Sequence, residues 1–258
     1  MPSVNSLASL AKCRDLEYLD LSQVGGSSID FRRLKKAISN LSKLKILHLP
    51  IYIPITQTNK SDGEWPPNIH ELKIGGTLHP EAMFFFDWPP KLMNLKLSKC
   101  KSLHSGMLNC ILESPQLAEG LNRLTIEGDN VVETLVSLSP PSNLYSLPKL
   151  EHLHVPMNKL WMFNILGPDK PALPLRSLAL TATDNDDFID YDELRPQLLE
   201  SLNFALSNLW SLGMDVKCYR NFEVDKESLD NLVMEHVEAA SDEELDKVAL
   251  SEVGFYVF

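Results

Sequence analysis

The sequence lacks the usual marks of a membrane or secreted protein. No apolar run approaches the roughly 20 residues that a bilayer-spanning helix needs. The N-terminal residues have no basic start followed by a sustained apolar segment, so they do not resemble a signal peptide. The four cysteines form no CxxC pair and no metal-ligand spacing. We therefore expect a protein of a reducing compartment, cytoplasmic or nuclear, with no metal or other cofactor.

Motifs of enzyme active sites are also lacking. The sequence has no Gly-rich phosphate loop, no GxSxG turn and no Cys/His pair in a recognisable context. Carboxylates gather at Asp184, Asp186, Asp187, Asp190, Asp192 and Glu193. One interpretation is a calcium site, but the central Gly and terminal Glu of an EF-hand loop are missing. Another is a metal-dependent enzyme that uses the acidic loop 184–193. We favour a solvated acidic loop and expect no catalytic activity.

One short apolar pattern recurs along almost the whole chain, and residues 92–100 show it most clearly. Leu92, Leu95 and Leu97 are followed there by Cys100, which gives the spacing LxxLxLxxC. Nine copies begin at residues 16, 44, 69, 92, 121, 150, 175, 209 and 250. The first six intervals are 23 to 29 residues, within the 20–29 residue period of leucine-rich repeats. Each copy is expected to contribute one strand of a parallel sheet.

The segments between the motifs predict helices and turns. Helices are expected over residues 30–41, 105–112, 192–206 and 226–240. In the first of these, Arg32, Arg33, Lys35 and Lys36 should face solvent. Trp-Pro-Pro at 65–67 and again at 88–90 predicts extended or turn-like connections, because proline cannot enter a helix interior. The two tryptophans are interpreted as packing residues, with partner anchors as the alternative.

These elements together predict an α/β horseshoe with a parallel concave sheet. We expect one domain over residues 1–258, formed by about nine irregular repeats. The central leucines of the motifs should be fully buried in one continuous column, formed by Leu19, Leu47, Leu72, Leu95, Leu124, Leu153 and Leu178.

Charge is distributed unevenly along the chain. Residues 1–180 contain 19 Lys+Arg and 16 Asp+Glu, whereas residues 181–258 contain 5 and 19. Strand positions between the apolar ones should line the concave side, and one such column is Asp20, His48, Lys73, Lys96, Thr125, His154, Ala179, Gly213 and Gly254. A candidate partner-binding surface follows from the basic residues on that side: His48, Lys73, Lys96, Lys99, Arg123, His152 and His154.

A rigid surface with one sign of charge suits a protein partner with an acidic or phosphorylated segment. The alternative is that these lysines only keep the strand surface soluble. His152 and His154 lie two apart on one strand face and could hold a metal, but no third ligand can be assigned. We expect neither nucleic acid nor a membrane as partner.

The LxxLxLxxC units resemble the leucine-rich repeat superfamily over about residues 16–258. Their irregular lengths, helical returns and Trp-Pro-Pro segments look most like the repeat region of fungal F-box/leucine-rich-repeat proteins. That resemblance implies the substrate-recognition part of an SCF-type ubiquitin ligase receptor, with a Skp1-like adaptor as a partner wherever an F-box is present. No F-box helix set is found before Leu16. The repeats also resemble the sensor region of intracellular immune receptors, for which residues 41–49 and 147–153 would fit.

Overall fold

The structure is a computed structural model, and it divides the chain into two compact units, Met1–Pro140 and Pro141–Phe258. It describes residues 9–24, 30–50, 63–76, 83, 86–100, 103, 105–127, 144–157, 165–166, 171–182, 190–238 and 253–258. The prediction of one domain over residues 1–258 stays a prediction.

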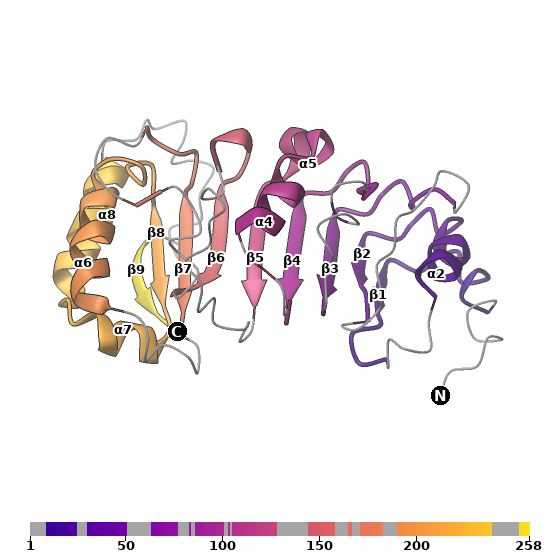
Figure 1. The fold of residues 1–258 in the computed structure, drawn as a ribbon, viewed down its shortest axis with the longest axis horizontal. Coiled ribbons are helices and arrows are strands. Elements are labelled where there is room, and N and C mark those ends of the chain that lie inside the picture. Colours follow the sequence, from indigo (N-terminus) through magenta and orange to yellow (C-terminus); the bar gives the residue numbers. More distant parts are fainter. Residues whose placement is uncertain are drawn as a thin grey trace. The chain divides into compact units, whose positions relative to one another are not determined.

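The described part of unit 1 contains five short parallel strands that follow one another in sequence order (Figure 1). They are β1 (Tyr18–Asp20), β2 (Ile46–His48), β3 (Glu71–Gly75), β4 (Asn94–Ser98) and β5 (Arg123–Glu127). Each begins two residues after the first apolar residue of its motif, and neighbouring strands pair in the register that the motifs predict. The α/β class and the parallel strands are therefore confirmed, whereas the horseshoe stays a prediction.

The central leucines of unit 1 line up across these strands and form its core. Leu47, Leu72, Leu95 and Leu124 are each 0% exposed, as predicted. Leu19 was expected to be fully buried as well, and that prediction is wrong because it is only half-buried. The physical reason is position: among the described residues, β1 has a neighbouring strand on one side only.

The described part of unit 1 includes the helices α2 (Phe31–Ile38), α4 (Ser105–Leu112) and α5 (Pro115–Gly120). The Asp30 side chain caps α2 by accepting a hydrogen bond from the Arg32 backbone amide. Lys35 does not face solvent, so that part of the prediction is wrong. Its side chain is 1% exposed, its Nζ lies 3.0 Å from Asp87 Oδ2, and it lies over the Trp65 ring. A charged residue is buried there because a carboxylate and a ring compensate it.

Neither Trp-Pro-Pro segment is helical, and each leads into a turn that begins at its second proline, Pro67 or Pro90. The Leu92 amide donates to the Pro89 carbonyl at 3.1 Å, which closes the second turn directly before β4. Trp65 and Trp88 are 5% and 1% exposed, and the indole of Trp65 donates to the Asp87 carbonyl. Their interpretation as packing residues is confirmed, because side chains buried this far leave little surface for a partner.

Unit 2 repeats the same plan with four described parallel strands (Figure 1). They are β6 (His152–Pro156), β7 (Ser177–Thr181), β8 (Ser211–Met214) and β9 (Gly254–Val257). Its described helices are η3 (Leu144–Ser146), α6 (Tyr191–Leu202), α7 (Val216–Phe222) and α8 (Lys226–Glu238). Leu153 and Leu178 are buried at 1% and 0% exposed, so the predicted leucine positions are confirmed in this unit too.

The ninth motif is shifted by two residues from its predicted register. Gly254 pairs with Ser211 and Phe255 pairs with Leu212, so Tyr256, and not Gly254, lies beside Gly213. The shift preserves the buried face, because side chains alternate along a strand with a period of two. Phe255 is 5% exposed, and its backbone amide donates to Asp230 Oδ1 at 2.8 Å, which ties β9 to α8 in this register.

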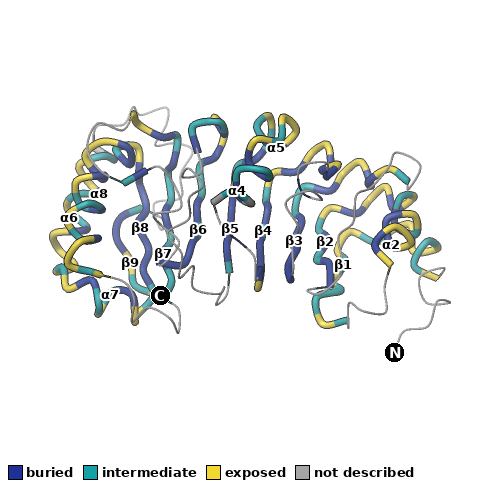
Figure 2. The backbone as a smooth tube through the Cα atoms, in the orientation of Figure 1, coloured by how far each residue is buried: buried dark blue, intermediate teal, exposed yellow. Residues whose placement is uncertain are grey.

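The helices of unit 2 alternate buried and exposed positions, as Figure 2 shows along α6 and α8. The Asp190 side chain caps α6 by accepting from the amides of Asp192 and Glu193. This helix ends at Leu202 and not at 206, because the chain turns at Asn203 and continues through turns to β8. In the described part of the chain, no helix has the length and apolar character that crossing a membrane requires.

Candidate functional site

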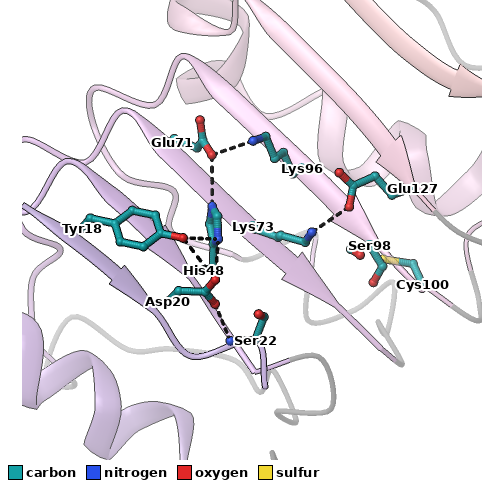
Figure 3. Close-up of polar contacts among 10 residues, drawn as sticks. All are labelled: Tyr18, Asp20, Ser22, His48, Glu71, Lys73, Lys96, Ser98, Cys100 and Glu127. Carbon is teal, nitrogen blue, oxygen red and sulfur yellow. Dashed lines mark hydrogen bonds and ion pairs between the residues drawn. The ribbon is translucent and has the colours of Figure 1, made fainter. Parts of the chain in front are cut away.

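The side chains that alternate with the buried leucines of unit 1 give its strands one polar surface, drawn in part in Figure 3. We define this polar sheet face by its charged and hydrogen-bonding residues, Tyr18, Asp20, His48, Glu71, Lys73, Lys96, Arg123 and Glu127. The residues come from all five described strands of the unit. Parallel strands in register therefore bring side chains from residues 18 to 127 into one surface.

Glu71 is the centre of the polar sheet face, because two cationic or potentially cationic side chains reach one of its oxygens. His48 Nε2 lies 3.1 Å and Lys96 Nζ 2.8 Å from Glu71 Oε1 (Figure 3). Burial raises the pKa of the Glu71 carboxyl, but the hydrogen bonds from Lys96 and His48 outweigh it, so its pKa is lowered overall. Glu71 is therefore a carboxylate at neutral pH, although its side chain is only 13% exposed.

The other side of the His48 ring faces Asp20 and Tyr18. Asp20 Oδ2 lies 3.4 Å from His48 Nδ1, and the Tyr18 hydroxyl donates to Asp20 Oδ2 at 3.1 Å. Hydrogen bonds from Ser22 lower the pKa of the Asp20 carboxyl to about 2, with help from Tyr18 and His48. A neutral imidazole can donate from one ring nitrogen only, so protonation of His48 would let it donate to both carboxylates.

Lys73 and Glu127 form the second ion pair of the polar sheet face. Lys73 Nζ lies 2.7 Å from Glu127 Oε2, so the Lys73 side chain on β3 extends past β4 to reach β5 (Figure 3). Burial raises the pKa of the Glu127 carboxyl, but the Lys73 hydrogen bond and charge lower it by more. The pair is partly buried, so solvent screens it less than a fully exposed pair.

The structure brings the predicted basic residues of unit 1 together, but three of them, His48, Lys73 and Lys96, lie beside carboxylates. Arg123 at the start of β5 and Lys99 directly after β4 are exposed. No side-chain partner of either is found in the described part of unit 1. Lys99 has a left-handed backbone with φ of 52°, and its amide donates to the Glu127 carbonyl at 2.9 Å. The polar sheet face therefore contains as many carboxylates (Asp20, Glu71 and Glu127) as lysines and arginines (Lys73, Lys96 and Arg123), and Lys99 adds one exposed positive charge directly after β4.

Sequence reasoning did not assign Glu71 and Glu127 to the site. Glu71 could have been found from the predicted register, because His48 and Lys96 each lie two residues beyond the position that pairs with Glu71 on the neighbouring strand. Glu127 lies two residues beyond Thr125, outside the column described above, and only a long lysine side chain crossing an intervening strand connects it to Lys73.

The remaining predicted residues lie in unit 2. His152 and His154 are on β6, and both make contacts with their surroundings. No group of three or more metal-binding side chains occurs among the described residues of either unit. Of the acidic segment, Asp190 caps α6, and residues 184–187 lie outside the described ranges.

The polar sheet face offers hydrogen-bond donors and acceptors but no activated nucleophile among the residues that Figure 3 draws. The thiol beside it, Cys100, is fully buried and donates weakly to the Ser98 carbonyl. Burial raises the pKa of the Cys100 thiol to about 12, so it stays protonated and unreactive at neutral pH. The charged side chains of the polar sheet face can form hydrogen bonds and ion pairs with a polar ligand.

No protein-family model matches this chain. The chain is similar to the F-box protein YDR306C of Saccharomyces cerevisiae, with 30% identity over 118 residues. That match covers 46% of this chain and 24% of the yeast protein, so the chain spans about a quarter of the length of this relative. The yeast protein's name connects this similarity with F-box proteins.

Proposed function

We propose that this chain is a non-catalytic protein-interaction module with leucine-rich-repeat architecture, which recognises substrates for an SCF-type ubiquitin ligase. The observation that carries the proposal is the polar sheet face, where register places charged side chains from five described strands side by side. The similarity to a yeast F-box protein supports the ubiquitin-ligase context. A Skp1-like adaptor is the further partner that this context implies.

In this proposal the partner segment is acidic or phosphorylated and contacts the basic residues of unit 1, which are His48, Lys73, Lys96, Lys99 and Arg123. Such a segment must replace Glu71 as the partner of Lys96, and Glu127 as the partner of Lys73. A phosphate group has three acceptor oxygens and about −1.5 to −2 charge, so it competes better than a carboxylate does. Arg123 is available without such competition and is suited to bidentate contact.

The ion pairs provide a sharp test of this partner class. Glu71→Gln removes the competing carboxylate, so an acidic ligand should bind several-fold more tightly, whereas Lys96→Met should weaken it about tenfold or more. The probe is a fluorescent 12-residue peptide with one phosphoserine among glutamates, titrated by anisotropy against the full chain. An unphosphorylated Ser/Gln peptide should bind much more weakly.

Lys45→Met is the matched control, because Lys45 also forms a 2.7 Å ion pair but lies before β2, outside the polar sheet face. If Lys96→Met and Lys45→Met lower affinity equally, only net charge matters and the site assignment is wrong. Weaker binding by Glu71→Gln would contradict an acidic partner. The ligase context is tested separately by affinity capture from native cell extract, where recovery of a Skp1-like adaptor is the expected result.

A further inference from the structure

Unit 2 carries exposed aromatic side chains on the strand face opposite its buried leucines. Tyr256 on β9 is 39% exposed, and Phe258, the residue after the end of β9, is 49% exposed. Their ring centroids are 5.9 Å apart, and the Phe258 ring meets the His154 ring edge-on at 6.2 Å. We call His154, Tyr256 and Phe258 the aromatic patch. Large aromatic side chains exposed this far on a sheet face are typical of interaction surfaces.

Small residues beneath the aromatic patch determine how Tyr256 lies. The register places Ala179 and Gly213 between His154 and Tyr256 on one row of the sheet. A Cβ atom on Gly213 would come within 2.6–2.7 Å of three atoms of the Tyr256 side chain. The tyrosine therefore lies across the neighbouring strand in the space that glycine leaves, with one side of its ring packed on backbone.

The charge of unit 2 indicates what could bind there. Residues 141–258 contain 9 Lys+Arg and 21 Asp+Glu. Two of those arginines already have partners within the unit, since Arg176 lies over the Trp210 ring and Arg195 pairs with Asp192. A surface in so acidic a unit attracts cations over long range, and aromatic ring faces bind guanidinium groups at short range.

We propose that the aromatic patch binds an arginine-containing basic segment of a partner protein. This surface is distinct from the polar sheet face of unit 1, and its ligand is basic, whereas the ligand proposed for unit 1 is acidic. Arginine suits it better than lysine, because the planar guanidinium stacks on aromatic faces and is more weakly hydrated than an ammonium group. The acidic charge of the unit speeds encounter, and the rings provide the specific contact.

The test uses the full chain and a fluorescent 12-residue peptide of alternating arginine and serine, titrated by anisotropy. Tyr256→Ala should weaken binding about two- to fivefold, the range expected for one exposed cation–π contact. Tyr256→Phe keeps the ring and should bind as the wild type does. A lysine-serine peptide of equal charge should bind less tightly to the wild type. Its affinity should also fall by a smaller factor in Tyr256→Ala.

Gly213→Ala tests the geometry without removing an aromatic ring or a charge. The added methyl group must displace the exposed Tyr256 ring, so binding should fall while the fold persists. If this variant does not fold, as judged by thermal denaturation, Tyr256→Ala decides the matter. The matched control is Phe204→Ala, which removes an aromatic side chain of similar exposure, 44%, elsewhere in unit 2.

Equal affinities for Tyr256→Ala and Phe204→Ala would overturn the proposal, because the peptide would then respond to net charge alone. Tighter binding of a neutral proline-rich peptide would overturn it too, as would a dimer of this chain that Tyr256→Ala dissociates. The proposal would be supported if only Tyr256→Ala and Gly213→Ala lower the peptide affinity, and if they lower it more for the arginine peptide than for the lysine peptide. Failure of the acidic-ligand test in unit 1 would leave this result unaffected, since the two tests share no residue.

Discussion

Leu95 and Leu19 occupy the same position in two copies of the repeated motif but differ in burial, so they form a matched pair for testing the core of unit 1. Leu95 is 0% exposed and lies between Leu72 and Leu124 on the neighbouring strands. Burying a leucine side chain contributes about 1.5–3 kcal/mol, and the cavity left by truncation adds to the loss. We expect Leu95→Ala to cost about 3–4 kcal/mol.

Leu19→Ala should cost only about 1 kcal/mol, because this half-buried side chain loses less apolar contact and solvent fills the space. The measurement is urea denaturation followed by tryptophan fluorescence, since Trp65 and Trp88 are buried in unit 1. The denaturation slope should stay constant across the variants. A cost below about 0.5 kcal/mol for Leu95→Ala, or an equal cost for both variants, would refute the assigned register.

Two further predictions concern charged groups of unit 1. Asp87→Ala should cost about 2–3 kcal/mol because it leaves Lys35 buried without a counter-ion, whereas Lys35→Met should be nearly neutral; equal urea midpoints for the two variants would contradict this. Asp20 has its pKa lowered from 3.8 to about 2, so the stability it contributes is present above about pH 4 and is lost as pH falls through 2. The difference in urea midpoint between wild type and Asp20→Asn should therefore shrink between pH 4 and pH 2, and a constant difference would show that Asp20 does not titrate with folding.

Much of the strand arrangement could be predicted from the sequence, because the apolar positions of the repeated motif determine which residues of neighbouring strands pair. Each copy buries alternate side chains, so a slip by one residue would expose every leucine, and neighbouring copies must align. Eight copies follow this rule within the described strands. The ninth does not, because its strand is positioned by the burial of Phe255 and the Asp230 contact, which no repeat spacing contains.

The candidate site was predictable in its location and less so in its charge. The basic residues of unit 1 were expected on one face, and alternation along strands is sufficient to place His48, Lys73 and Lys96 there. Their neutralisation could not be predicted in the same way. Whether a lysine pairs with an acid depends on side-chain reach across strands, as for Lys73 and Glu127, which are 54 residues apart in sequence.

The sequence by itself determined the parallel strands, their register in unit 1 and the buried leucine column, because period and apolar spacing are local properties repeated along the chain. Only the tertiary structure decided that Lys35 is buried, that Glu71 and Glu127 balance the polar sheet face, and that Tyr256 lies across Gly213. Each of these depends on atoms from segments distant in sequence meeting within a few ångströms. Such distances follow from packing, and no residue pattern within one repeat contains them.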